Sequence, residues 1–182
     1  MDVLPEEAWD GLVRFRREAE WPEGCKVQIV GGLVAVAPPP ESAHNDTVDE
    51  LQRLLYTVIP RDWGAYQALE LTVPGGQGLF VPDLAVAPKA RQAEDAPRLV
   101  VEVTSRCGAR HDRVDKLRGY AALGVPLYLL LDPWHSGKPT ATLYGEPEDG
   151  SYRVLAMVKY GDELRLPAPF DVTVDTSLFP VG

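Results

Sequence analysis

The chain has 182 residues, of which 45% are hydrophobic and 25% charged, and its formal net charge is −9. This length and composition predict one soluble globular domain, and no apolar run approaches the ~20 residues of a membrane span. The charged N-terminus lacks the apolar core of a signal peptide, and the two distant cysteines fit neither a zinc cluster nor a disulfide framework. We therefore expect a cytoplasmic protein with no membrane partner that forms a single domain over residues 1–182.

The negative charge is unevenly distributed along the chain. Residues 88–119 hold eight basic and five acidic residues, whereas the remainder holds ten basic and twenty-two acidic residues. Nucleic-acid-binding proteins contact phosphates through Lys and Arg, so the overall charge argues against extensive contact of this kind. The segment 88–119 nevertheless fits a local basic patch, and equally a solvated helix face and loop.

The N-terminal half is expected to contain two helices and several short strands. Residues 1–20 predict a helix within an N-terminal extension over residues 1–24, and an apolar stripe predicts a second helix over residues 41–58. Gly31-Gly32 separates two β-type runs and indicates a hairpin. The strands expected in this half are residues 26–30, 33–37, 66–73 and 79–87.

The C-terminal half contains the most apolar strands. Residues 99–103 and 127–131 are continuous apolar runs apart from Glu102, which is typical of central strands. A helix is expected over residues 110–123, with Asp112 and Asp115 resembling a capping pair near its start. Further short strands are expected at residues 140–144, 152–158, 162–166 and 170–174. Together, the expected helices and strands predict a mixed α/β (α+β) domain with two principal helices packed on strands.

Two carboxylates stand among these apolar strands. Asp83 follows Pro82 within the run of residues 80–87, and Glu102 interrupts the run of residues 99–103. An ionised carboxylate inside a buried strand is costly unless a metal ion, a cation or hydrogen bonds compensate it. Neighbouring strands could bring both groups to one edge of the sheet, where they suit a hard divalent cation such as Mg²⁺ (or Mn²⁺). Such an ion polarises a phosphoryl oxygen and activates a water nucleophile.

Three other side chains are candidates to act with the carboxylates. Lys116 could stabilise phosphoryl charge in a transition state or orient the attacking water. Tyr120 lies one turn along the same helix face. His44, near the start of the second helix, could act on a proton, contact phosphate or bind metal. Each candidate also has a simpler interpretation. Asp83 could be an ordinary strand-start aspartate, and Glu102 could pair with an arginine. Lys116 could be a solvated lysine, and His44 could be structural.

Other hydrolase chemistries have less support in the sequence. Ser105 follows a strand but lacks the GxSxG turn of a Ser/His/Asp hydrolase. A glycosidase with two carboxylates stays open as an alternative, although nothing indicates an aromatic platform for a sugar.

One set of residues matches a known pattern: Pro82-Asp83, Val101–Ser105, Asp112, Lys116, Tyr120, Gly124-Val125 and Leu131–Pro133. The earlier segment Val30–Val34, followed by Pro39, Pro40 and His44, adds to it. Together these residues resemble the Uma-two family of restriction-endonuclease-type proteins, which belongs to the PD-(D/E)xK phosphodiesterase superfamily. The resemblance extends over residues 25–178, and its central block is the most specific part.

The resemblance implies a restriction-endonuclease-like fold, with a mixed central sheet, flanking helices and additional C-terminal strands. It implies Asp83 and Glu102 as ligands of Mg²⁺ (or Mn²⁺), and it places Asp83, Glu102 and Lys116 in the catalytic site. His44, Asp112 and Tyr120 are the candidates for supporting roles.

The sequence departs from the pattern at two positions. The superfamily lysine that stands two residues after the glutamate is Thr104 here, and Lys116 matches the lysine that Uma-two proteins carry on the following helix. Gln28 stands where similar proteins often have a glutamate on the first strand, so the site would carry one negative charge less. Similar proteins also tend to pair as homodimers.

We therefore expect a metal-dependent endonuclease that hydrolyses phosphodiester bonds in DNA. The alternative is a catalytically inactive nucleic-acid-binding or protein-interaction module that keeps the nuclease fold, which the net charge and Thr104 favour. A third reading is a structural homodimer with no substrate.

Overall fold

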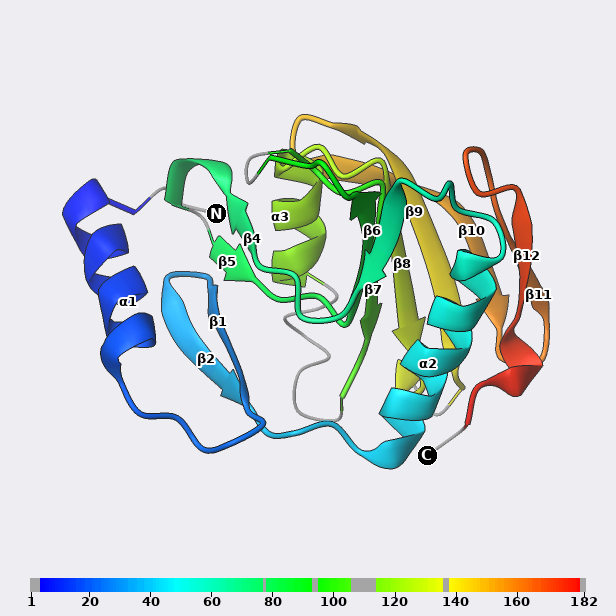
Figure 1. Ribbon diagram of the computed structural model, residues 1–182, viewed down its shortest axis with the longest axis horizontal. Coiled ribbons are helices and arrows are strands. Elements are labelled where there is room, and N and C mark those ends of the chain that lie inside the picture. The colour runs from blue at the N-terminus through cyan, green and yellow to red at the C-terminus, as the bar shows by residue number, and fades with distance from the viewer. Residues whose placement is uncertain (1–3, 77, 93–94, 106–113, 136–137, 181–182) are drawn as a thin grey trace.

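The computed structural model describes residues 4–180, with the exception of residues 77, 93–94, 106–113 and 136–137. A six-stranded sheet forms the centre of the molecule, in the order β10-β9-β8-β7-β6-β3 (Figure 1). Strands β7 and β8 run parallel, and the other neighbours are antiparallel. The strands are β3 (Trp63–Tyr66), β6 (Leu84–Pro88), β7 (Leu99–Val103), β8 (Leu127–Asp132), β9 (Thr140–Glu148) and β10 (Ser151–Lys159).

One face of the central sheet is covered by the helix α2 (Ser42–Tyr56) and by a C-terminal hairpin of β11 (Glu163–Leu166) and β12 (Val172–Asp175). The apolar stripe of α2, with Val48, Leu51 and Leu55, packs in one core with the sheet and with this hairpin. The helical spacing of those residues is the reason that α2 buries one side only.

The other face is covered by the short helix α3 (Lys116–Ala122) and by a second, four-stranded sheet. The order of this small sheet is β2-β1-β5-β4. Its aromatic and aliphatic side chains pack with Tyr120 of α3 and with Val100 and Tyr128 of the central sheet. The strands are β1 (Lys26–Val30), β2 (Leu33–Ala37), β4 (Leu71–Val73) and β5 (Gly78–Phe80).

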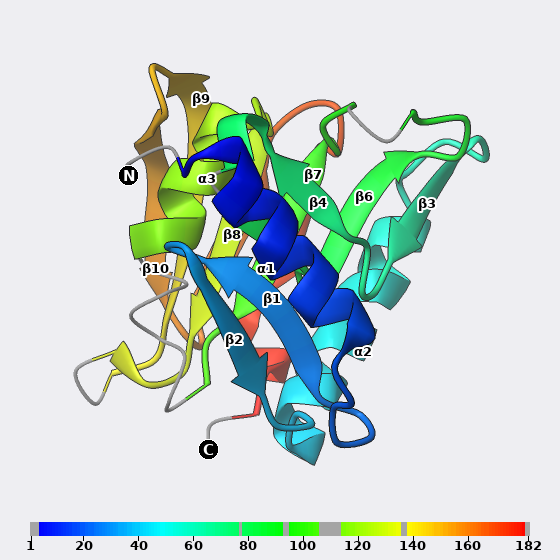
Figure 2. The ribbon, with the colours of Figure 1, turned by 90° about the vertical axis from the view of Figure 1, so that its left-hand side faces the viewer.

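The N-terminal helix α1 (Glu6–Glu18) lies on the outer side of the small sheet, where it crosses the strands obliquely (Figure 2). Trp9, Leu12 and Val13 pack there against Ile29 of β1, Leu79 of β5 and Val81. None of the helices in the described part of the chain is long and apolar enough to cross a membrane.

Much of the predicted element pattern is confirmed. The hairpin strands at residues 26–30 and 33–37 and the strand at 99–103 have the bounds expected from the sequence. Every residue of β7 and β8 is buried, as expected for central strands. The helix expected over residues 110–123 is described only from its later part, and the predicted supporting residue Asp112 lies outside the described residues.

Two predicted strands are wrong, because each divides between the two sheets. The run at residues 66–73 becomes β3 and β4, since the backbone at Ala68 is left-handed (φ 58°) and cannot continue a strand. The run at 79–87 becomes β5 and β6. Its break lies at Val81 and Pro82, where proline has no N–H to donate and the N–H of Val81 binds a side chain instead.

Candidate active site

Asp83 and Glu102 lie next to each other on the side of the central sheet that faces α3. The antiparallel pairs end with Leu84 and Val101, and one further step in the same register places Asp83, just before β6, opposite Glu102. Ala85 and Val100, which share their faces by strand alternation, belong to the core that contains α3. The backbone N–H of Val103 donates to Oδ2 of Asp83 at 2.8 Å, which fixes this carboxylate against β7.

Glu102 is compensated by two donors from α3. Its Oε1 accepts from Nζ of Lys116 at 2.8 Å and from the hydroxyl of Tyr120 at 2.5 Å. Lys116 and Tyr120 are four residues apart on the helix, so both reach the same oxygen from one face. The side chains of Glu102 and Lys116 are only 2% and 4% exposed. The charge of Glu102 is therefore neutralised within the fold. Its partner is a lysine and not the arginine of the simpler interpretation.

Asp83 is surrounded by cationic and hydrogen-bonding groups. Lys26 donates to its Oδ1, and Nε2 of His44 lies 3.1 Å from its Oδ2. Burial by itself raises the pKa of Asp83, but the hydrogen bond from His44 and the charges of Lys26 and Lys116 outweigh it. The pKa of Asp83 therefore lies well below its usual value of 3.8, and the group is ionised at neutral pH.

Lys116 acts on both carboxylates. It donates directly to Glu102, and its positive charge also lowers the pKa of Asp83. The structure thus brings Asp83, Glu102, Lys116, Tyr120 and His44 into one cluster. Nδ1 of His44 is buried and has no hydrogen-bond partner among the described residues.

Two residues of the first strand, Lys26 and Gln28, complete the cluster. The sequence alone does not indicate Lys26 as a site residue. Lys26 begins β1, and nothing in its local sequence distinguishes it from an ordinary strand-start lysine. Gln28 is buried, and its Oε1 accepts from the N–H of Val81 at 2.8 Å. Gln28 therefore holds the connection between β5 and β6, which carries Asp83, so it has a positioning role as an amide.

Thr104 also has a clear structural role. Its hydroxyl donates to Oδ1 of Asp132 at 2.8 Å, and the same oxygen accepts from the backbone N–H of Trp134 at 3.2 Å. Nδ1 of His135 lies 3.5 Å from the other oxygen of Asp132. Thr104, two residues after Glu102, thus joins the ends of the parallel strands β7 and β8.

The donor set suits a hard divalent cation. Two ionisable carboxylates share one face, and oxygen ligands of this kind are those that Mg²⁺ and Mn²⁺ prefer. In the part of the chain that the structure describes, no group of three or more His, Cys, Asp or Glu side chains is arranged for a metal. Asp83 and Glu102 are the residues that could hold such an ion, and water and substrate oxygens would complete its shell.

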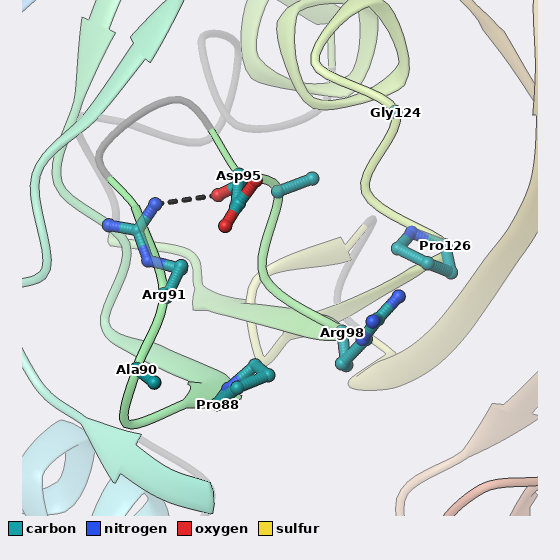
Figure 3. A pocket seen from close by; sticks show the side chains of 8 residues that line it. Pro88, Ala90, Arg91, Asp95, Arg98, Gly124 and Pro126 are labelled. Atoms are coloured by element: carbon teal, nitrogen blue, oxygen red, sulfur yellow. Dashed lines mark hydrogen bonds between the residues drawn. The ribbon is translucent and has the colours of Figure 1, made fainter.

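A hollow of about 320 Å³ lies at the opposite end of the central strands (Figure 3). Pro88, Arg98 and Pro126 line it, at the end of β6 and at the starts of β7 and β8. Arg91 points toward Asp95 at one side of this hollow and donates to its backbone oxygen at 2.6 Å. Because Asp83 and Glu102 lie at the other ends of these strands, the hollow is separate from the candidate site.

The mixed central sheet, its flanking helices and its extra strands define a restriction-endonuclease-like fold. A crystal structure of a protein from Anabaena variabilis, described as "a putative nuclease", has this fold with a TM-score of 0.68. The two chains are 18% identical over 94% of this chain and 96% of that one.

The family follows from the sequence match. The model of the Uma2 (Uma-two) family, described as "Putative restriction endonuclease", matches residues 15–177. The chain belongs to this family, as the resemblance in the central block predicted. No curated protein matches the chain.

Proposed function

We propose that the protein is a metal-dependent endonuclease that hydrolyses phosphodiester bonds in DNA. The observation that carries the proposal is the pair of adjacent carboxylates, Asp83 and Glu102, on one face of the sheet beside the buried ammonium group of Lys116. The family description and the fold support the same class of reaction.

In this proposal Asp83 and Glu102 hold Mg²⁺ or Mn²⁺. When bound, such an ion polarises a phosphoryl oxygen and lowers the pKa of a water that attacks phosphorus. Lys116 offsets the charge of the carboxylates and stabilises the negative charge that develops on the phosphoryl group. Tyr120 keeps Glu102 in place, and His44 does the same for Asp83 through its Nε2.

A homodimer is part of the proposal, because two sites of opposite orientation allow both strands of a duplex to be cut in one encounter. A two-fold dimer supplies such a pair of sites from one kind of chain. We also propose that the protein acts in the cytoplasm, a reducing compartment that its two distant cysteines fit.

The decisive experiment measures cleavage of plasmid DNA by purified protein with Mg²⁺, with Mn²⁺ and with EDTA. The wild type is expected to nick or cut the plasmid only with a divalent ion, and Asp83→Asn and Glu102→Gln should abolish this cleavage. Glu50→Gln, at an exposed position of α2, is the matched control and should cut like the wild type. Equal residual cleavage by wild type and site variants, all folded by circular dichroism, would contradict the proposal.

One observation favours a catalytically inactive nucleic-acid-binding or protein-interaction module instead. Both carboxylates are paired with lysines, Asp83 with Lys26 and Glu102 with Lys116, so the fold compensates them without an ion. Salt-sensitive DNA binding by a wild type that never cuts would select a binding module. A wild type that neither binds nor cuts DNA would point to a protein partner.

A further inference from the structure

The two lysines of the cluster differ in how far solvent can reach them. Lys116 is 4% exposed and is held by Glu102, in the core beneath α3. Lys26 is 24% exposed, and it reaches Asp83 from β1 of the small sheet. A substrate that approaches from solvent therefore meets Lys26 before it meets Lys116.

The strand β1 determines the direction of the Lys26 side chain. Residues 26, 28 and 30 alternate onto the side of β1 that faces the central sheet, since Gln28 binds the connection before Asp83 and Val30 packs in the core with α3. Residues on the opposite side, such as Ile29, pack toward α1. Lys26 therefore points across the space between the two sheets toward Asp83.

Before a metal ion is bound, a phosphodiester that approaches the cluster meets the carboxylates Asp83 and Glu102, whose negative charge must be offset by protein cations. Lys116 faces these carboxylates from within the core, so attraction of the phosphate in the absence of a metal ion needs a cation on the solvent side. Lys26 satisfies this need, because a lysine ammonium has three donors on a flexible stem. It can keep one contact with Asp83 while it donates to a phosphate oxygen.

We propose that Lys26 binds a backbone phosphate of the nucleic acid at the entrance of the site. This inference rests on the proposed function, and it assigns the substrate contact to the N-terminal hairpin. The competing explanation is that Lys26 only neutralises Asp83. The two explanations differ in the number of phosphate contacts, which the slope of the salt dependence reports, because an ion pair with Asp83 alone releases no counterion from DNA.

The test measures binding of a short DNA duplex by fluorescence anisotropy in EDTA over a range of salt concentrations. Lys26→Gln removes the charge but keeps a donor for Asp83, and Lys26→Arg keeps the charge. Each lost phosphate contact reduces the slope of log K against log salt by about 0.9 for duplex DNA. We expect this reduction and weaker binding for Lys26→Gln, and a slope like that of the wild type for Lys26→Arg.

Lys159→Gln is the matched control, because Lys159 is an exposed lysine at the end of β10 and outside the cluster. It should leave the slope unchanged. An unchanged slope for Lys26→Gln, with a melting temperature like that of the wild type, would overturn the role of Lys26 and leave the endonuclease proposal intact. A wild type that shows no salt-dependent DNA binding would overturn both. A wild type that binds with the expected slopes but never cuts would overturn hydrolysis alone.

Discussion

Nζ of Lys116 lies 2.8 Å from Oε1 of Glu102, and both side chains are almost completely buried. The first residue of α3 thus forms an ion pair with a residue in the middle of a buried strand. Desolvation of each charge is costly, and the partner charge is what offsets that cost. The pair therefore belongs to the stability of the fold as well as to the proposed chemistry.

Replacing Lys116 by methionine leaves Glu102 buried without its ammonium partner. Removing one member of a buried ion pair typically costs about 3–5 kcal/mol, so we expect a large loss in the free energy of unfolding measured with urea. The matched control is Arg53→Ala, which breaks an exposed pair with Asp49 on α2 and should cost less than about 1 kcal/mol. Equal losses for the two variants would contradict a buried pair.

Tyr120→Phe removes only the hydroxyl that donates to Glu102, and leaves the ring among its aromatic neighbours. A hydrogen bond to a charged group contributes about 1.5–3 kcal/mol, and we expect a loss of this size in urea unfolding. Tyr152→Phe serves as the comparison, because its hydroxyl donates to the neutral carbonyl of Val125 at 2.7 Å. Its loss should be nearer to about 1 kcal/mol. A smaller loss for Tyr120→Phe than for Tyr152→Phe would argue against a charged acceptor.

The low pKa of Asp83 predicts how stability depends on pH. Because the folded pKa lies below the unfolded value of 3.8, the unfolded chain takes up the proton first as the pH falls. The contribution of Asp83 to stability is therefore complete above about pH 5 and is lost progressively below about pH 4. The free-energy difference between wild type and Asp83→Asn, measured with urea at several pH values, should shrink in that acidic range. A difference that grows on acidification would indicate a raised pKa instead.

Gly119 of α3 packs closely against the small sheet. A Cβ at this position would overlap the ring of Phe80 and would also lie 3.3 Å from Val73. We expect Gly119→Ala to cost about 1–3 kcal/mol by overpacking, despite the better helix propensity of alanine. Gly11→Ala in α1 meets no atom within 4 Å and should stabilise the protein by about 0.5–1 kcal/mol. Thermal and urea unfolding of both variants checks that their free energies of unfolding change in opposite directions.

The local pattern was enough to find the elements that carry the candidate site. An apolar run with one glutamate predicted a buried strand, and the cost of that buried charge predicted a compensating partner for Glu102. A period of two cannot show where a strand leaves one sheet and enters another, which is why the pattern over residues 66–73 and over 79–87 predicts one strand each. The breaks depend on a left-handed backbone at Ala68 and on the Gln28 contact with Val81.

The sequence by itself determined the family, the hairpin of β1 and β2, the buried strand β7 and the costly positions of Asp83 and Glu102. Only the tertiary structure decided which cations compensate each carboxylate. Lys26 lies 57 residues from Asp83 along the chain, and the two meet because the small sheet docks on the central sheet. Strand periodicity records which face a side chain occupies, whereas its partner on another sheet is set by how the layers pack.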